Sequence, residues 1–95
     1  MRIYHVYIMA SDSGTLYVGV TGGLEGRVAQ HKKGEIKGFT QQYKCHKLVY
    51  FEEFEDIEQA ILREKQIKRW RRDKKQELIK QMNPSWLDLA AEWNP

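Results

Sequence analysis

The chain has 95 residues and a mass of 11.3 kDa, which suffices for one domain but not for two separate hydrophobic cores. Hydrophobic residues make up 41% of it, so residues 1–95 are expected to form a single folded domain, and wholesale disorder is excluded. No apolar run approaches the roughly 20 residues of a membrane span, so no membrane partner is expected. The lone cysteine, Cys45, excludes an intramolecular disulfide and a CxxC metal site, and it agrees with a cytoplasmic location.

The formal net charge is only +3, but the charges are segregated along the chain. Residues 52–58 hold five carboxylates and no base, whereas residues 63–80 hold nine basic residues against three acidic ones. A looser group of five lysines lies between residues 32 and 47. Concentrated positive charge typically binds a polyanion, so nucleic acid is the predicted partner. The alternative is a solvated helix surface rich in lysine and arginine.

Two segments near the start of the chain are rich in β-branched and aromatic residues. Ile3–Met9 and Thr15–Val20 are separated by Ala-Ser-Asp-Ser-Gly, which predicts a β-hairpin. If the hairpin is symmetric about Asp12, Tyr7 lies directly across from Tyr17, with Cβ atoms about 4.5–5.5 Å apart. The two phenols then either share a functional site or form an ordinary aromatic pair.

A short helix, a loop and a third strand are predicted next. The helix opens at Gly22–Gly23 and stops at Gly34, because glycine commonly ends helices. Residues 35–46 are predicted to form a basic loop. Leu48–Phe51 is a continuous apolar run, typical of a strand that is buried on both faces.

Two polar residues of the short helix share one side. Arg27 and His31 are four residues apart and therefore project in the same direction. A guanidinium can hold a phosphate through two hydrogen bonds, and an imidazole can donate or accept a proton. A plain surface pair would show the same spacing.

The last third of the chain has a helical pattern. It runs from Asp56 to about Met82, with a break expected near Arg72–Asp73, and Asn83-Pro84 ends it. Ser-Trp-Leu-Asp at residues 85–88 has the pattern of a capping box, and apolar residues follow at helical spacing. A terminal helix is therefore predicted, packed on the domain or in a dimer interface.

Glu64 interrupts an apolar stripe. With Ile57 at zero on a helical wheel of about 100° per residue, Ala60 and Ile61 flank that position and Glu64 falls between them. A carboxylate aimed at the core costs several kcal/mol in desolvation unless a cation or strong donors meet it. Lys68, one turn later, can supply the cation, and so can a divalent metal ion. We favour a functional carboxylate with a metal partner.

These residues, in this order, resemble the GIY-YIG nuclease family. Its two signature tripeptides correspond here to Val6-Tyr7-Ile8 and Tyr17-Val18-Gly19, one on each strand of the hairpin. The Arg27–His31 pair follows on the next helix, and Glu64 lies on the later one. Asn83-Pro84-Ser85-Trp86 resembles the ending of small stand-alone bacterial members.

The resemblance implies an α/β fold, with a central three-stranded antiparallel sheet flanked by helices, and phosphodiester hydrolysis assisted by one divalent cation. We expect Glu64 to hold Mg²⁺ or Mn²⁺. Tyr17 would help to deprotonate the attacking water with the cation's assistance, since a free phenol has a pKa of about 10. Some members carry a lysine directly after the second tripeptide, where Val20 stands here, so one cation that could activate the phenol is missing. The remaining expected roles are orientation of water or phosphate by Tyr7, charge balance by Arg27, proton transfer by His31 and support of the phosphate or metal by Asn83.

A separate set of residues is expected to bind nucleic acid. It comprises Lys32, Lys33, Tyr43, Lys44, Lys65, Lys68, Arg69, Arg71 and Arg72. The basic side chains would contact backbone phosphates, and Tyr43 would either stack on a base or pack within its loop. Backbone contacts carry little sequence information, so structure-guided or weakly sequence-specific cleavage is expected, of DNA rather than RNA and endonucleolytic rather than exonucleolytic.

Two other function classes fit the sequence. One is a nucleic-acid-binding module of the same fold with weak or no catalysis, and the other is a basic protein-interaction domain. The expected assembly is a monomer or weak dimer, with an unknown protein partner as a further option.

Overall fold

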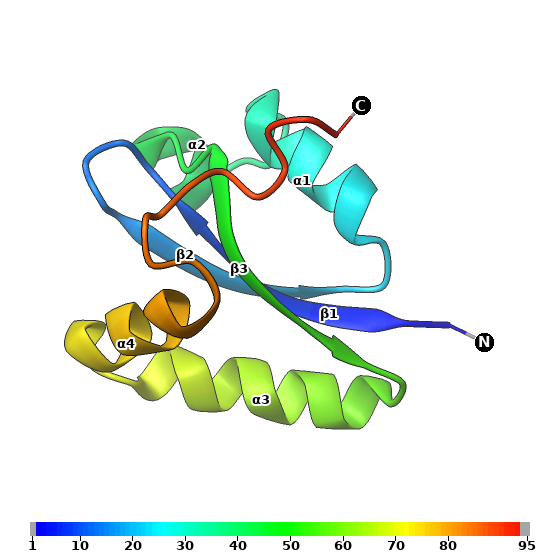
Figure 1. Ribbon diagram of the computed structural model, residues 1–95. Helices are drawn as coiled ribbons and strands as arrows, with labels where there is room; N and C mark the ends of the chain where they lie inside the picture. Colours follow the sequence, from blue (N-terminus) through cyan, green and yellow to red (C-terminus); the bar gives the residue numbers. More distant parts are fainter. Residues whose placement is uncertain (1, 94–95) are drawn as a thin grey trace.

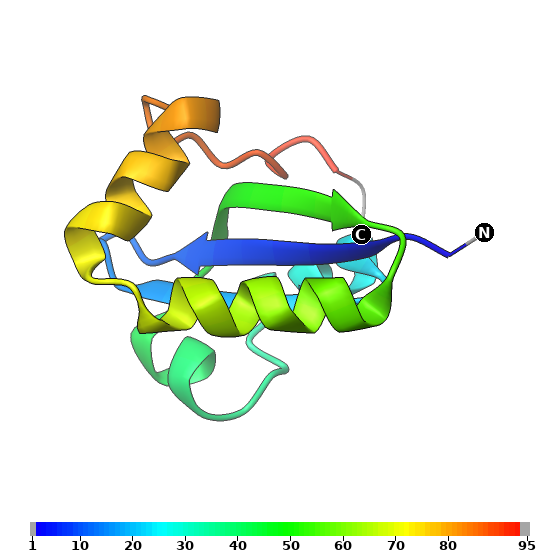
Figure 2. The same ribbon diagram turned by 90° about the horizontal axis from the view of Figure 1, so that it is seen from below.

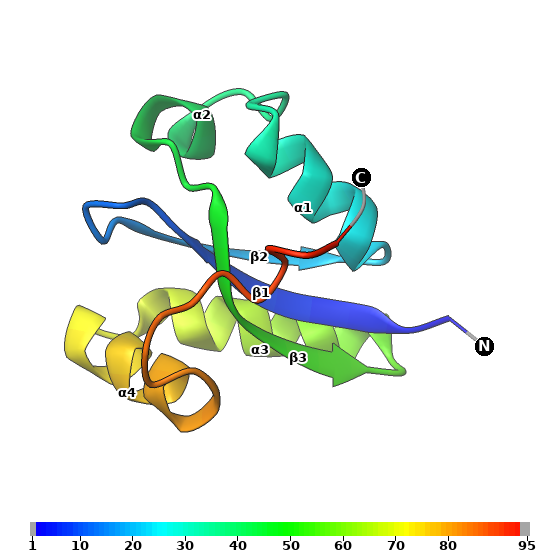
Figure 3. The same cartoon turned by 45° about the horizontal axis from the view of Figure 1, so that its top comes forward.

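The computed structural model describes residues 2–93 and contains a three-stranded antiparallel sheet of order β2-β1-β3 between two layers of helices (Figure 1). The predicted fold class is confirmed. The strands are β1 (Tyr4–Ala10), β2 (Leu16–Thr21) and β3 (Lys47–Phe54), and the helices are α1 (Leu24–Lys32), α2 (Phe39–Tyr43), α3 (Ile57–Arg69) and α4 (Arg72–Met82). Helices α1 and α2 cover one face of the sheet, whereas α3 and α4 cover the other (Figure 3).

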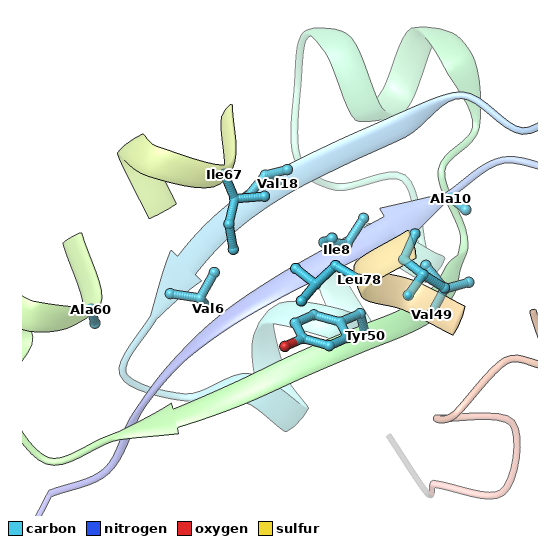
Figure 4. Close-up of a cluster of buried hydrophobic side chains, with 10 residues drawn as sticks. Val6, Ile8, Ala10, Val18, Val49, Tyr50, Ala60, Ile67 and Leu78 are labelled. Atoms are coloured by element: carbon cyan, nitrogen blue, oxygen red, sulfur yellow. The ribbon is translucent and has the colours of Figure 1, made fainter. Parts of the chain in front are cut away.

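Each face of the sheet has its own core because side chains alternate along the strands. Val6 and Ile8 of β1 and Val18 of β2 pack with Ile67 of α3 (Figure 4). Ile79 of α4 belongs to the same cluster. Four of these five side chains are fully buried and Val18 is nearly so, and burying a side chain of this size contributes about 1.5–3 kcal/mol. Tyr7 of β1 and Tyr17 of β2 lie on the opposite face, packed towards α1. The sheet thus has a mostly aliphatic core on the side of α3 and α4, and on the side of α1 a core that contains Tyr7 and Met9.

The hairpin register differs from the predicted one. Tyr7 lies opposite Gly19, and Met9 lies opposite Tyr17, so the turn is centred on Ser13 and not on Asp12. Hydrogen bonds within the turn set this register, since Ser11 pairs with the main chain of residues 14 and 15. The shift is two residues in the pairing, so both phenols stay on the same face but lie diagonally.

The long helical pattern is divided into two helices. Helix α3 lies lengthwise along the sheet, beside β1 and β2 (Figure 2). It ends at Arg69 because Trp70 adopts an extended conformation with ψ 149°, and α4 begins at Arg72. The Trp70 ring is held there between the guanidinium of Arg63 and the ammonium of Lys74. The break was predicted close to its actual place. No helix within residues 2–93 is long and apolar enough to cross a bilayer.

The predicted terminal helix is wrong, since residues 83–93 form turns and extended chain. Asp88 does not cap a helix there. Its carboxylate accepts hydrogen bonds from the Leu48 and Ala90 amides and pairs with Lys32. Leu89 N–H in turn donates to the Leu48 carbonyl at 2.7 Å. These tertiary bonds tie the segment to β3, and they outweigh the weak helical preference of a short amphipathic stretch.

The predicted loop over residues 35–46 contains a short helix, α2. Thr40 is buried on it, and its carbonyl accepts a hydrogen bond from the Cys45 amide at 3.1 Å. Gly38, with φ +100°, precedes the helix and turns the chain into it. The sequence pattern of one helical turn is too short to stand out from loop composition.

Candidate active site

The side chain of Tyr7 lies across the backbone of β2. Tyr7 is 2% exposed, and a Cβ added to Gly19 would lie 2.5 Å from its hydroxyl. Only a residue without a side chain leaves room for this ring, which explains the glycine in the second tripeptide. Because β2 is an edge strand, the hydroxyl is carried to the border of the sheet.

His31 meets Tyr7 from α1. Its Nε2 is hydrogen-bonded to the Tyr7 hydroxyl at 2.9 Å, and the residue is 3% exposed. Burial, followed by the positive charge of Arg27, lowers the pKa of His31 to about 4. The imidazole is therefore neutral at neutral pH, and it orients the phenol through a hydrogen bond rather than an ion pair.

Tyr7 is held as a neutral phenol. Burial raises the pKa of its hydroxyl above the usual range, and the negative charges of Tyr17 and Glu64 act in the same direction, opposed by Arg27. His31 Nδ1 is buried with no hydrogen-bond partner among the described residues. An unpaired buried N–H is the rarer and costlier arrangement, so we assign the imidazole proton to Nε2. The Tyr7 hydroxyl then accepts from His31 and keeps its own proton to donate.

Tyr17 is the more accessible phenol. It is half-buried on β2, with ring centroids 6.3 Å from Tyr7 and 5.4 Å from His31. The Nζ of Lys68 lies 6.0 Å from the centre of the Tyr17 ring. Lys68 on α3 therefore supplies the positive charge that Val20, next to the second tripeptide, does not.

Glu64 reaches the same border of the sheet from α3. Its side chain is 14% exposed and pairs with Lys68 at 3.1 Å. Ala60 and Ile67 face the core, but Ile61 is 36% exposed, so Glu64 borders a narrower apolar stripe than its spacing predicted. Lys68 is therefore the cation that meets this largely buried carboxylate in the structure, and a divalent metal partner stays a prediction.

The donor set suits a hard divalent cation. Within residues 2–93, no three or more His, Cys, Asp or Glu side chains lie close enough together to hold a metal ion among them. A single carboxylate such as Glu64 fits Mg²⁺ or Mn²⁺, because Mg²⁺ commonly binds one or two protein carboxylates and keeps water and substrate phosphate as its other ligands. Zinc, which favours several nitrogen and sulfur ligands, does not fit.

Comparison with known proteins identifies the domain. Residues 3–77 match the family described as the GIY-YIG catalytic domain. The chain belongs to the GIY-YIG family. It is 39% identical over 82 residues to the UPF0213 protein HQ_3675A of Haloquadratum walsbyi, a match covering 85% of this chain and 92% of that protein. It is 36% identical over 81 residues to the UPF0213 protein SAV0488 of Staphylococcus aureus, covering 85% and 99%.

A solved structure shows the same fold. The solution NMR structure of the UPF0213 protein BH0048 from Bacillus halodurans aligns with a TM-score of 0.60 over 95% of this chain and 97% of that one, at 24% identity. These relatives are small stand-alone GIY-YIG proteins. GIY-YIG is a family of nucleases that generally use divalent metal ions, so a nucleic acid substrate is implied at the level of the family.

Asn83 lies outside the cluster of phenols in this GIY-YIG protein. Val49 is an extra residue in the pairing of β3 with β1, and its carbonyl accepts a hydrogen bond from Asn83 Nδ2 at 3.1 Å. The same amide also exchanges two hydrogen bonds with the main chain of Leu87. These bonds satisfy a β-bulge and anchor the terminal segment, which gives Asn83 a structural role.

Three of the predicted nucleic-acid-binding side chains form an ion pair or a hydrogen bond within the protein. Lys32 pairs with Asp88, Lys68 pairs with Glu64, and Arg72 donates to the Gly14 carbonyl. The other six are exposed, namely Lys33, Tyr43, Lys44, Lys65, Arg69 and Arg71. Phe39, which stacks on Tyr17, was not predicted as a site residue, because the single turn of α2 that carries it was expected to be part of a loop.

Proposed function

We propose that this GIY-YIG protein is a metal-dependent nuclease that hydrolyses phosphodiester bonds in nucleic acid, with DNA favoured over RNA and internal cleavage favoured over cleavage from ends. The observation that carries the proposal is the hydrogen-bonded Tyr7–His31 pair beside Tyr17, with Arg27 and Glu64 close enough to act on the Tyr7 hydroxyl. Simple backbone binding requires no such assembly of neutral and charged groups.

Hydrolysis of a diester forms a bond from water oxygen to phosphorus and breaks the bond to the leaving oxygen, which departs as an alkoxide and takes a proton from solvent water. A cation held by Glu64 would supply charge neutralisation at the phosphate oxygens. Tyr17 would accept the proton of the attacking water, helped by the ammonium of Lys68 near its ring. Tyr7 would donate its free proton to the water or phosphate and so fix their position. His31 would hold Tyr7 in that orientation.

Arg27 would balance the charge that develops on the phosphate. It is exposed on α1, and its positive charge acts on both Tyr7 and His31. A mobile guanidinium at the rim of the site can close on a phosphate through two hydrogen bonds. Nonspecific affinity would come from exposed cations of α3 and of the α3–α4 junction, namely Lys65, Arg69 and Arg71.

The second candidate function is a nucleic-acid-binding module with weak or no catalysis. The Lys68–Glu64 pair favours it, because an internal cation already balances the carboxylate that would bind the metal. The two functions differ in a simple way. A nuclease needs Glu64 for turnover, whereas a binding module would hold nucleic acid equally well without it.

The decisive experiment compares wild type with Glu64→Gln on labelled DNA and RNA, as single strands, duplexes and branched duplexes, in Mg²⁺, Mn²⁺ or chelator. Glu58→Gln is the matched control, because Glu58 is an exposed carboxylate in the first turn of the same helix. We expect metal-dependent cleavage that Glu64→Gln abolishes and Glu58→Gln leaves intact. A covalently closed circular strand separates internal cutting from exonuclease action. Equal cleavage by both variants would refute the nuclease assignment to this site.

A further inference from the structure

Phe39 and Tyr43 form an exposed aromatic pair one turn apart on α2. They are 46% and 47% exposed, and their ring centroids are 4.7 Å apart. Phe39 also stacks on Tyr17, with 6.3 Å between centroids and 30° between the ring planes. Tyr17, Phe39 and Tyr43, termed the aromatic row, therefore run from the phenol of the active site to the protein surface.

The fold does not need these two rings to hold α2. Thr40 is the buried residue of the helix, and its carbonyl is bonded to the amide of Cys45, which is 0% exposed. Gln41 Nε2 donates to the Gly34 carbonyl at 2.8 Å and ties the helix to the preceding loop. Phe39 and Tyr43 are left facing water, where large apolar surface beside a functional site indicates a ligand.

The charge around the aromatic row specifies the kind of ligand. Lys33, Lys37 and Lys44 are exposed on the segment that carries α2. None of the ion pairs found between residues 2 and 93 involves them. Stackable rings flanked by uncompensated lysines match a strand of nucleic acid, whose bases offer flat faces and whose phosphates offer negative charge.

We propose that the aromatic row stacks on unpaired bases next to the phosphate in the active site, so that the substrate is single-stranded nucleic acid; this inference rests on the proposed function. In a duplex, neighbouring bases cover both faces of each base. A ring on the protein surface reaches such a face only where the strand is single or the base is flipped out. Because Phe39 contacts Tyr17, the stacked base belongs to a nucleotide close to the reacting phosphate.

Binding of nucleic acid in the presence of chelator tests the aromatic row, because the proposed cleavage needs a divalent cation and does not occur there. Fluorescence anisotropy would compare a labelled oligothymidylate, an oligouridylate of equal length and a DNA hairpin duplex with the same number of phosphates. Phe39→Leu and Tyr43→Leu keep apolar bulk but remove the ring, and Tyr43→Phe restores it. Each leucine variant should weaken single-strand binding by about 5- to 150-fold and leave hairpin binding nearly unchanged. Leu62→Ala is the control, since Leu62 is 61% exposed on α3 and should change neither.

Three results would overturn the proposal that the aromatic row stacks on unpaired bases. The first is leucine variants that bind oligothymidylate as wild type does, and the second is an equal loss of affinity for the single strand and the hairpin. The third is self-association of the protein that the leucine variants abolish. The thymidylate and uridylate arms show whether the strand is DNA, RNA or either. Wild type that binds single strands but cleaves nothing in Mg²⁺ or Mn²⁺ would refute the proposed hydrolysis alone. If the leucine variants cleave and bind as wild type does, base stacking by the aromatic row would be refuted, but the proposed hydrolysis would not.

Discussion

Replacing Gly19 with alanine tests how closely Tyr7 is packed across β2. The new Cβ would lie 2.5 Å from the Tyr7 hydroxyl oxygen and 2.6 Å from Cζ, whereas ordinary contact begins at 3.4 Å. The ring therefore has to move by about 0.9 Å at its far end. Overpacking of this kind costs about 1–3 kcal/mol of unfolding free energy. In a domain of this size, each kcal/mol lowers Tm by about 4–8 °C.

The displacement should also reduce cleavage, because it moves the Tyr7 hydroxyl away from His31 Nε2. A misplacement near 1 Å at a reacting group can cost on the order of 10²-fold in rate. Thermal unfolding followed by circular dichroism measures the first effect, and single-turnover cleavage of labelled DNA measures the second. Stability and activity should therefore fall together.

Gly26→Ala is the matched control. Gly26 lies inside α1, and an added Cβ there meets nothing within 4 Å. Alanine is the better helix former, so this variant should gain about 0.5–1 kcal/mol and cleave at the wild-type rate. If Gly19→Ala melted and cleaved like wild type, the close approach of Tyr7 to β2 would be refuted.

The remaining predictions concern pH, the lysine of the site and salt. Because the pKa of His31 is lowered to about 4 from an ordinary 6.5, the unfolded chain binds more protons between these values. Stability should then fall by about 1–3 kcal/mol as pH drops from 6.5 to 4, and urea titrations of His31→Gln should show a smaller loss. Lys68→Met should reduce the single-turnover cleavage rate at saturating enzyme by about tenfold or more, because it removes the cation beside Glu64 and the Tyr17 ring, whereas Lys65→Met, also exposed on α3, should cleave nearly as wild type does. Replacing Arg69 and Arg71 by glutamine should reduce the slope of log affinity against log salt by about one to two; an unchanged slope would remove these side chains from the phosphate-binding surface.

Composition and local spacing were sufficient to predict the three strands and the main helices, and the resemblance to the GIY-YIG family supplied their arrangement in one antiparallel sheet. Side chains alternate along these strands, and the two cores on opposite faces of the sheet follow from that alternation. The hairpin register was mispredicted because Ser11 and Gly14, not the midpoint of the polar run, define the turn. The terminal helix was mispredicted because Asp88 binds the Leu48 amide, 40 residues away, and local pattern contains no information about such a bond.

The active site is built from contacts that no single segment predicts. Tyr7 and His31 are 24 residues apart, and their hydrogen bond depends on how α1 crosses the sheet. The resemblance to the GIY-YIG family predicted that these residues belong to one site. The resemblance did not predict that Lys68 lies beside the Tyr17 ring or that Phe39 stacks on that ring, because both contacts depend on side-chain packing.

Paramagnetic broadening by Mn²⁺ tests the common site most directly. In a titration of the isotope-labelled protein followed by NMR, the signals of Glu64, Tyr17, Tyr7 and His31 should broaden first and together. Glu64→Gln should abolish this effect while leaving the rest of the spectrum in place. Broadening confined to the acidic run at residues 52–58, or equal broadening in the variant, would contradict a single cation site at the border of β2.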